Sequence, residues 1–253
     1  MKKNKLVYII PTYNEKENIE AMLKFVQKML STLSKYDSSI LVVDDNSPDG
    51  TGKIVKRLMQ HNRSIFLLKG NKNGLGMAII RGYKYAIKNL GADIVVTNEA
   101  DFSYSPSCVP EMMKLLENDT DVVFGSRKLT ALNKWSTGRK TIHWVANTLF
   151  AKIVAGVTQV EDHNSAFKIV RVKSVLNKIN FDNFPKGFAF FNYLTFRISQ
   201  TTPKISEFFV TYTPRSKGSS KISLTPKYLK YFLKDTAEYI LTCLRIRKEK
   251  LFP

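Results

Sequence analysis

The fold of this chain is decided by residues 40–50, which read ILVVDDNSPDG: a short apolar run, two acids and a turn-forming segment. An apolar run of this length that stops at turn residues predicts a buried β-strand. Similar runs occur at residues 6–10, 65–68 and 94–96. Between the runs, apolar residues recur at helical spacing in residues 18–33, 54–58 and 74–89. Strands that alternate with helices and are apolar throughout predict an α/β fold, with a mostly parallel central sheet and helices on both faces.

Beyond about residue 125 the pattern is weaker. Residues 142–157 and 172–179 predict helices, and residues 207–212 alternate as a strand does. Residues 226–253 form a basic amphipathic segment that predicts a C-terminal helix. We therefore expect a catalytic domain at residues 1–225, followed by this helix, packed on the domain or on a membrane.

Composition limits the class of protein. The 253 residues, 43% of them hydrophobic, suffice for one domain with a full core. Forty lysines and arginines against 21 acids give a formal charge of +19, which attracts nucleic acid, anionic membranes or phosphorylated small molecules alike. The two cysteines, Cys108 and Cys243, lie far apart and indicate a reducing compartment. No apolar run reaches the roughly 18 to 20 residues that a membrane span requires, so we expect a protein that does not span a bilayer.

Polar residues follow three of the predicted strands, at residues 11–15, 44–45 and 99–103. Ligands of parallel sheets bind beyond the carboxyl ends of the strands, so these residues predict one site. The sequence contains neither G-x-G-x-x-G after the first strand nor a G-x-x-x-x-G-K-[ST] loop. Glu99 and Asp101 instead place two carboxylates on one loop, where they can hold the divalent cation that a nucleoside diphosphate needs. Solvated loop tips also carry such pairs, so the pair alone is a weak signal.

Four motifs occur together in one order: PTYNEKENI at residues 11–19, VDDNSPDGT at 43–51, GLG at 74–76 and EAD at 99–101. In this order and spacing the chain resembles the inverting family 2 glycosyltransferases of the GT-A fold. Among these it is similar to dolichyl-phosphate mannose synthases and related polyprenyl-phosphate sugar synthases. Further matches extend the resemblance over residues 5–225: GSR at 125–127, Trp135, Arg139, residues 146–147 and RSKGSSK at 215–221.

The resemblance implies transfer of a hexose, mannose first, from GDP-mannose or another nucleoside-diphosphate sugar to a polyprenyl (dolichyl) phosphate, with inversion and with Mg²⁺ or Mn²⁺ as cofactor. The nucleoside pocket that it implies consists of Pro11, Tyr13, Glu15, Val43 and Asp45. Glu99, Ala100, Asp101 and Ser103 would lie at the diphosphate and metal, with Asp101 as the metal ligand and Glu99 and Ser103 beside it. Arg127, Arg139, Arg215 and Lys221 would bind the donor diphosphate or the acceptor phosphate. The catalytic residues would be Asp101, Arg127, Arg139 and Asp162.

Three hypotheses about the acceptor and the activity stay open. A polyprenyl phosphate is anionic near neutral pH, so its attack needs no strong general base, in keeping with the lack of histidine in the matched motifs. A same-fold enzyme that acts on a glycan or lipid hydroxyl would need a base, and Asp162 is the candidate. A non-catalytic lipid- or nucleic-acid-binding protein with a decayed site is the third. No nucleic-acid-reading module is recognisable, so no nucleic acid partner is expected.

Several positions depart from the family pattern. Glu99 replaces the first Asp of the usual Asp-Ala-Asp, and Asn164 and Ala166 replace Thr and a Gly or Ser. Phe191 and Tyr193 stand where the family has Gln and Glu. These departures affect the sugar more than the reaction class.

The lipid acceptor implies a membrane. Residues 142–157 and 226–253 offer apolar faces with basic flanks, which suit amphipathic helices at an anionic interface or helices packed on the sheet. We expect a cytoplasmic protein, peripheral on the cytosolic face of a membrane, with a membrane-anchor protein as a possible partner.

Overall fold

The computed structural model describes residues 3–128, 135–213 and 226–252, which contain a seven-stranded sheet in the order β3-β2-β1-β4-β6-β5-β7. All neighbouring strands are parallel except that β6 runs antiparallel to both β4 and β5. The strands are β1 (Asn4–Thr12), β2 (Tyr36–Asp44), β3 (Ile65–Lys69), β4 (Ile94–Thr97), β5 (Val122–Arg127), β6 (Lys168–Arg171) and β7 (Ile205–Val210). The helices are α1 (Ile19–Ser31), α2 (Thr51–His61), α3 (Leu75–Lys88), α4 (Val109–Glu117), α5 (Thr137–Trp144), α6 (Ala189–Ser199) and α7 (Pro226–Leu251). The predicted α/β fold with a mostly parallel sheet is confirmed.

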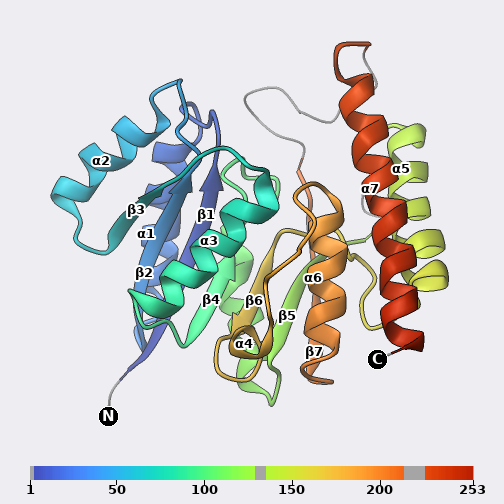
Figure 1. Cartoon of the computed structure of the whole chain (residues 1–253). Coiled ribbons are helices and arrows are strands. Elements are labelled where there is room, and N and C mark those ends of the chain that lie inside the picture. The colour runs from blue at the N-terminus through green and yellow to red at the C-terminus, as the bar shows by residue number, and fades with distance from the viewer. Residues whose placement is uncertain (1–2, 129–134, 214–225, 253) are drawn as a thin grey trace.

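Helices cover both faces of the sheet (Figure 1). Successive side chains of a strand point to opposite faces, so β1 contributes to two cores. Val7 and Ile9 pack with residues of α3, α6 and α7, whereas Tyr8 and Ile10 pack with residues of α1, α2 and α4. Burial on both faces explains why the strands are apolar throughout, rather than alternating.

The helix predicted at residues 142–157 begins as α5 and continues into a π-helical segment, Val145–Val154. Helix α7 packs beside it (Figure 1), and the Tyr239 hydroxyl of α7 donates to the Ala146 carbonyl at 3.0 Å. No helix in the described part of the chain is long and apolar enough to cross a bilayer.

The helix predicted at residues 172–179 is wrong. Residues 172–175 form a turn after β6, and only Leu176–Lys178 forms a short 3₁₀ helix. Val172, Val175 and Leu176 are all buried, so the core takes them up from a turn and their helical spacing has no structural counterpart. The predicted strand at 207–212 is β7, which begins two residues earlier, at Ile205.

Candidate active site

Strands β1, β2 and β4 end at one edge of the sheet, because β1 pairs in parallel with both of the others. Thr12 is opposite Asp44, and Ile9 is opposite Thr97. The following loops continue the pairing: the Asp45 amide donates to the Thr12 carbonyl at 3.1 Å. Residues predicted from three separate motifs are therefore brought to one place, as expected for a ligand site of a parallel sheet.

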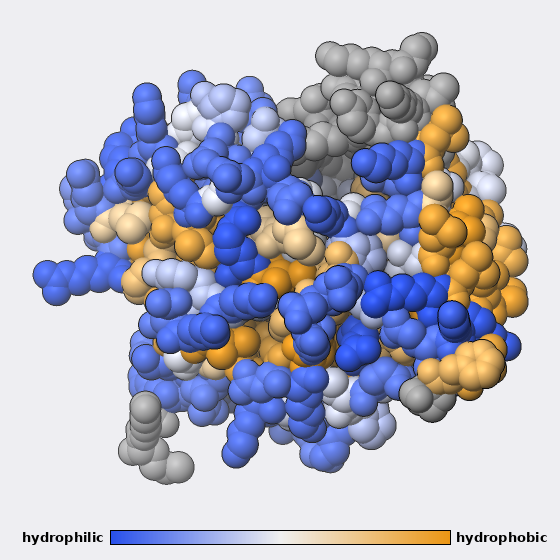
Figure 2. Space-filling view, in the orientation of Figure 1, coloured by the Kyte–Doolittle hydropathy of each residue, from blue (hydrophilic) through white to orange (hydrophobic). Residues whose placement is uncertain are grey.

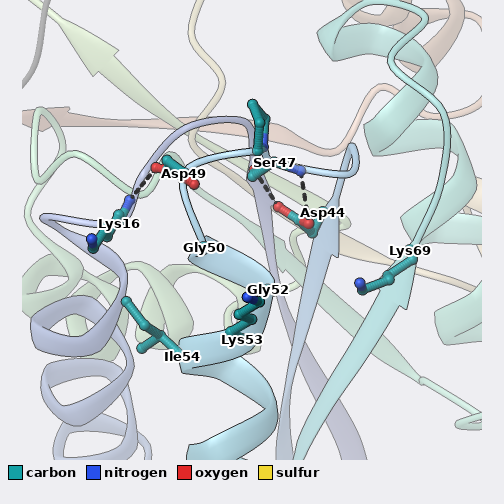
Figure 3. A pocket seen from close by; sticks show the side chains of 10 residues that line it. Lys16, Asp44, Ser47, Asp49, Gly50, Gly52, Lys53, Ile54 and Lys69 are labelled. Carbon is teal, nitrogen blue, oxygen red and sulfur yellow. Dashed lines mark hydrogen bonds between the residues drawn. The ribbon is translucent and has the colours of Figure 1, made fainter.

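Asp44 holds two of these loops together. Its side chain is 1% exposed, and its oxygens accept hydrogen bonds from the Thr12 hydroxyl at 3.0 Å and from the Ser47 hydroxyl and amide at 2.5 and 3.1 Å (Figure 3). Ser47 in turn accepts the Asn14 amide at 3.0 Å. Carboxylate acceptors make strong hydrogen bonds, so Asp44 fixes the relative position of the first two motifs.

Glu15 is the buried end of the first motif. It is 6% exposed, its amide donates to the Thr51 hydroxyl at 3.0 Å, and its carboxylate accepts from Asn18 Nδ2 at 2.9 Å. Beside it, the Lys16 amide donates to Asp49 Oδ2 at 2.9 Å (Figure 3). A cavity of about 420 Å³ opens here between the Ser47–Asp49 turn and the start of α2. Neither Tyr13 nor Asp45 lines it, so it is separate from the predicted nucleoside pocket.

The other predicted pocket residues surround Asp45. Pro11 and Val43 are opposite each other in register and both are buried, and the Val43 side chain belongs to the core. Asp45 is 6% exposed and forms an ion pair with Arg81 of α3. The Lys72 ammonium lies over the Tyr13 ring, 3.9 Å from the ring centroid.

The Glu99–Ser103 loop is shaped by Asn98, which is fully buried. Asn98 Nδ2 donates to the Tyr8 hydroxyl at 2.9 Å and to the Tyr104 carbonyl at 3.1 Å, and its Oδ1 accepts the Glu99 amide at 2.8 Å. Asp101, which is 4% exposed, accepts the Ser103 amide at 2.9 Å. These bonds form a tight loop that brings both carboxylates to the strand end.

The donor set of this loop fits a hard divalent cation, because Mg²⁺ and Mn²⁺ prefer carboxylate and hydroxyl oxygens. Among the described residues, no group of three or more His, Cys, Asp or Glu side chains could enclose a metal ion. Glu99, Asp101 and Ser103 therefore suit a cation whose remaining ligands are phosphate oxygens and water, as is usual for Mg²⁺.

On the other side of the sheet centre, Arg127 and Asp162 form a buried ion pair. Arg127 Nε and Nη2 donate to the two Asp162 oxygens at 2.6 and 2.9 Å, and the Arg127 amide adds a third bond at 3.1 Å. Asp162 is fully buried and the Arg127 side chain is 11% exposed. Burial alone raises the pKa of the Asp162 carboxyl, but the charge and hydrogen bonds of Arg127 outweigh it and hold that pKa below its usual range.

Aromatic rings enclose this ion pair. Arg127 Cζ lies 5.5 to 5.7 Å from the ring centroids of Tyr104, Trp135 and Tyr212. Arg139, which is exposed, places its guanidinium 4.1 Å from the Trp135 ring. Rings attract a cation at these distances, so Trp135 links the buried arginine to the exposed one. Arg215 and Lys221 lie outside the described residues.

Two buried titratable residues lie next to the ion pair. Lys168 on β6 is 1% exposed, donates to the Ser165 carbonyl, and lies 4.9 and 5.2 Å from the Phe124 and Phe191 rings. Burial lowers its pKa to about 7. Burial likewise lowers the pKa of His163 to about 4, and neither of its ring nitrogens has a hydrogen-bond partner among the described residues.

Comparison with known proteins decides the family. The model of "Glycosyl transferase family 2" matches residues 8–190. The chain belongs to this family. It is 32% identical over 223 residues to the undecaprenyl-phosphate mannosyltransferase of Micrococcus luteus. The matched region covers 87% of this chain and 88% of that relative. The chain is also 30% identical over 220 residues to the polyprenol monophosphomannose synthase of Mycolicibacterium smegmatis, covering 85% of this chain and 80% of that one.

Solved structures agree on the GT-A fold of this family 2 glycosyltransferase. Glucosyl-3-phosphoglycerate synthase of Mycobacterium tuberculosis, crystallised with Mn²⁺ and UDP, superimposes with a TM-score of 0.69 at 17% identity, covering 97% of this chain and 80% of that one. A mannosyltransferase of Pyrobaculum calidifontis, crystallised with GDP-Man and Mn²⁺, gives 0.59 at 15% identity, with 97% and 74% covered. Metal binding is thus typical of its neighbours.

Two departures from the family 2 pattern have structural consequences. Phe191 packs over the buried Lys168, and the Tyr193 hydroxyl donates to Glu249 of α7 at 3.0 Å. The glycines of the GLG motif, Gly74 and Gly76, are packed closely against other segments. A Cβ at Gly74 would lie 2.4 Å from the Lys186 carbonyl oxygen, and one at Gly76 would lie 2.5 Å from the Phe190 ring.

Sequence reasoning missed Arg81, Lys72 and Lys168. Arg81 and Lys72 stand in the helix and the loop after the third strand, away from every acidic motif, and their partners become neighbours only on folding. Lys168 is the first residue of β6 and stands between Phe167 and Ile169, and a lysine in this apolar stretch was the one signal that could have marked it.

Proposed function

We propose that the chain transfers mannose from a nucleoside-diphosphate sugar, GDP-mannose first, to a polyprenyl phosphate with inversion of the anomeric centre. Two relatives named for mannose transfer to a polyprenyl phosphate, each matched over most of both chains, support this acceptor class. The donor rests on the loops at the ends of β1, β2 and β4, and inversion rests on the resemblance to the inverting family 2 enzymes. The free cysteines accord with action on the cytosolic face of the membrane.

The buried Arg127–Asp162 pair is the observation that favours a phosphate acceptor. A hydroxyl acceptor needs a general base, and Asp162 was the candidate. Its carboxylate is fully buried, accepts three hydrogen bonds from Arg127 and has a lowered pKa, so it is a poor proton acceptor. A phosphate monoester, whose second pKa is about 6, attacks as an anion and needs no such base.

On the donor side we assign the nucleoside to Pro11, Tyr13, Glu15, Val43 and Asp45, and a Mg²⁺ or Mn²⁺ ion to Glu99, Asp101 and Ser103, beside Ala100. When bound, the ion would neutralise charge on the diphosphate leaving group. Asp101 is the principal ligand, because its burial and its bond to the Ser103 amide keep its carboxylate in one orientation.

On the acceptor side the two arginines have different roles. The charge of Arg127 is balanced by Asp162, so we assign it to shaping the site together with the aromatic rings. Arg139 is exposed and stacked on Trp135, and guanidinium forks match phosphate oxygens, so we assign it to the incoming lipid phosphate. Arg215 and Lys221 complete the phosphate-binding set in this proposal.

We further propose that α5, the π-helical segment and α7 lie on an anionic membrane. Exposed apolar side chains occur on all three segments: Ile142 and Trp144 of α5, Leu149 and Ile153 of the π-helical segment, and Leu233, Leu241, Leu244 and Leu251 of α7. Figure 2 shows an apolar surface on the side of the molecule where α7 lies in Figure 1. The acids of α7 face inward: Asp235 and Glu238 lie against Gly187, and Glu249 contacts Tyr193. Its outer face therefore combines leucines with exposed lysines and arginines, which suits an anionic interface.

The transfer proposal is tested with purified full-length chain, Mg²⁺ or Mn²⁺, and labelled GDP-mannose, UDP-glucose or UDP-N-acetylglucosamine. Undecaprenyl or dolichyl phosphate and the matching free polyprenol serve as paired acceptors. We expect label from GDP-mannose in the lipid fraction with the phosphate and none with the alcohol. Transfer to the alcohol would favour the hydroxyl-acceptor enzyme, and transfer to neither would overturn the proposal.

The membrane proposal is tested by flotation with vesicles that contain anionic lipid or phosphatidylcholine alone. Ile153→Asp together with Leu241→Asp should abolish binding to the anionic vesicles. Phe25→Asp, an equally apolar exposed position on α1, is the matched control and should leave binding unchanged. Equal loss with the control, or binding that ignores lipid charge, would contradict this orientation.

A further inference from the structure

In the described part of the chain, Arg81 forms an ion pair with Asp45, the carboxylate predicted to lie in the nucleoside pocket. Nη2 of Arg81 donates to Asp45 Oδ1, with side chains 27% and 6% exposed. Arg81 reaches this position because its neighbour Gly82 lets α3 approach the sheet: a Cβ there would lie 3.0 Å from Ile9 and Val43 side-chain carbons. The ion pair is thus largely removed from water, where a hydrogen-bonded pair is most directional.

The chain makes room for this guanidinium at Gly70, directly after β3. A Cβ on Gly70 would lie 2.3 Å from Arg81 Cζ and 2.5 Å from Nε. The Gly70 backbone is outside the left-handed region, so glycine is required there by space and not by conformation. The buried Nε of Arg81 has no partner among the described residues, a state that native proteins rarely tolerate away from functional sites.

The same loop reaches the rest of the predicted nucleoside pocket. Asn71 accepts a hydrogen bond from Asn46 Nδ2 at 3.3 Å, and the Lys72 ammonium lies over Tyr13. Gly70 itself donates its amide to the Asp44 carbonyl at 3.0 Å. Arg81 and the 70–72 loop therefore contact four positions of the first two motifs from the side of β3.

We propose that Arg81 is a positioning residue for the nucleoside: it orients the Asp45 carboxylate to accept an N–H of the base, and Gly70 keeps the space that this requires. The proposal rests on the proposed function, because it takes Asp45 as a base contact. A carboxylate that already points at its donor loses less conformational freedom on binding, so it binds more tightly. Arg81 acts through Asp45 and touches neither the diphosphate nor the sugar.

The test measures binding of GDP and UDP with Mg²⁺ to the full chain by calorimetry. Arg81→Ala should weaken the better-bound nucleotide roughly tenfold, the usual effect of removing a charge-assisted hydrogen bond. Arg81→Lys should restore part of the loss. Gly70→Ala should weaken binding in the same direction although every charge is retained, because its methyl group displaces the guanidinium. In the transfer assay these variants should raise KM for the donor more than they lower kcat.

A double-mutant cycle identifies the route of the effect. In an Asp45→Asn background, Arg81→Ala should have little further effect, whereas additive losses would overturn the assigned role. Arg57→Ala, which breaks an exposed pair with Glu20, is the matched control and should bind as the wild type does. Unchanged affinity in both Arg81→Ala and Gly70→Ala would overturn the inference alone. Wild-type protein that binds neither nucleotide would overturn the donor site as well, whereas binding without lipid transfer would affect only the acceptor proposal.

Discussion

The donor loops and the acceptor side of this sheet are built on different principles. On the donor side, carboxylates at the strand ends are held by backbone amides and short hydroxyl side chains, as Asp44 is by Thr12 and Ser47. On the acceptor side, charges are enclosed in the protein: Asp162 is fully buried, Lys168 is 1% exposed, and aromatic rings surround Arg127.

The difference separates binding from stability. A carboxylate held by hydroxyls and a backbone amide, as Asp44 is, can lose its charge without leaving an uncompensated ion in the core. Asp45, which pairs with Arg81, is an exception on the donor side. Removal of one member of a buried ion pair leaves the other charge unbalanced in a medium of low polarity. Substitutions on the donor side should therefore impair ligand binding and catalysis first, and those on the acceptor side should lower the free energy of unfolding first.

The largest expected effect on turnover is on the donor side, at Asp101. Asp101→Ala and Asp101→Asn should lower transfer by about 100-fold or more, because the metal that balances the leaving group loses its principal ligand. The side-chain oxygen of the asparagine can still accept the hydrogen bond from the Ser103 amide. The free energy of unfolding of the Asp101→Asn variant should therefore stay within about 1 kcal/mol of the wild type. Turnover of labelled donor and urea denaturation measure the two quantities.

The matched control is Glu99→Asp, which restores the usual family residue and keeps the charge. It should retain substantial activity. Full activity in Asp101→Ala would remove the metal site from this loop, whatever the behaviour of Glu99.

An effect on stability rather than on turnover is expected on the acceptor side, at Asp162. Asp162→Asn should lower the free energy of unfolding by about 3 to 5 kcal/mol, because Arg127 stays buried without its counter-charge. Arg127→Met with Asp162→Asn should recover much of this loss, since an apolar side chain replaces the unpaired ion. Urea denaturation at pH 7 gives the values, and exposed Lys204→Ala, which breaks the pair with Asp119, is a control that should change little. A stable single variant would contradict the proposed division of the two sides.

The same contrast explains what the sequence could predict. The donor motifs are local: the acids at 44–45 and 99–101 directly follow apolar runs that can be recognised as strands, and parallel pairing of β1 with β2 and β4 brings them together. Fold class, strand-end site and family followed from these runs and motifs. The antiparallel β6 was not predicted, because it has only four residues and begins with a lysine and ends with an arginine.

The acceptor side depends on contacts between distant segments, which no local pattern records. Asp162 and Arg127 are 35 residues apart. The donor side also has such a contact, the Asp45–Arg81 pair, which spans 36 residues. The apolar spacing at residues 172–179 predicted a helix, but apolar residues buried in a turn can show the same spacing. The turn after β6 buries these side chains, and the sequence did not distinguish the two cases. The sequence motifs marked Asp162 and Arg127 as candidate site residues, but only the fold shows that they neutralise each other.

Acidification should sharpen the contrast further, at His163. Burial depresses the pKa of His163 to about 4. During acidification the folded protein therefore protonates this histidine at a lower pH than the unfolded chain, whose histidines titrate near 6.5. Neutral His163 makes its full contribution to the free energy of unfolding above pH 6.5. The free energy of unfolding then decreases as the pH falls toward 4, by about 2 kcal/mol between pH 7 and pH 5. His143 behaves in the same direction, with a pKa of about 4, also chiefly from burial.

The measurement is urea denaturation at pH 7 and pH 5 of the wild type, His163→Gln and His143→Gln. Each variant should show a smaller loss between the two pH values than the wild type does. His61→Gln, on the surface at the end of α2, is the control and should reproduce the wild-type pH dependence. Identical pH dependence in all four proteins would rule out buried neutral histidine as the cause.

The smallest effect is expected where the acceptor side meets α7, at Tyr193. Its hydroxyl donates to Glu249 at 3.0 Å and accepts from Arg245 at 2.7 Å, and the Arg245 guanidinium lies 4.5 Å from its ring. Tyr193→Phe removes the hydrogen bonds and keeps the ring, so it should cost about 1 kcal/mol, felt mainly as faster amide exchange near the end of α7. Tyr85→Phe, whose hydroxyl has no hydrogen-bond partner among the described residues, is the matched control. Hydrogen exchange read by mass spectrometry distinguishes the cases: faster exchange confined to α7 places this helix on the acceptor side as a separately opening unit. Equal acceleration across the sheet would instead mean that α7 and the catalytic core unfold together, and that the donor and acceptor sides share one stability.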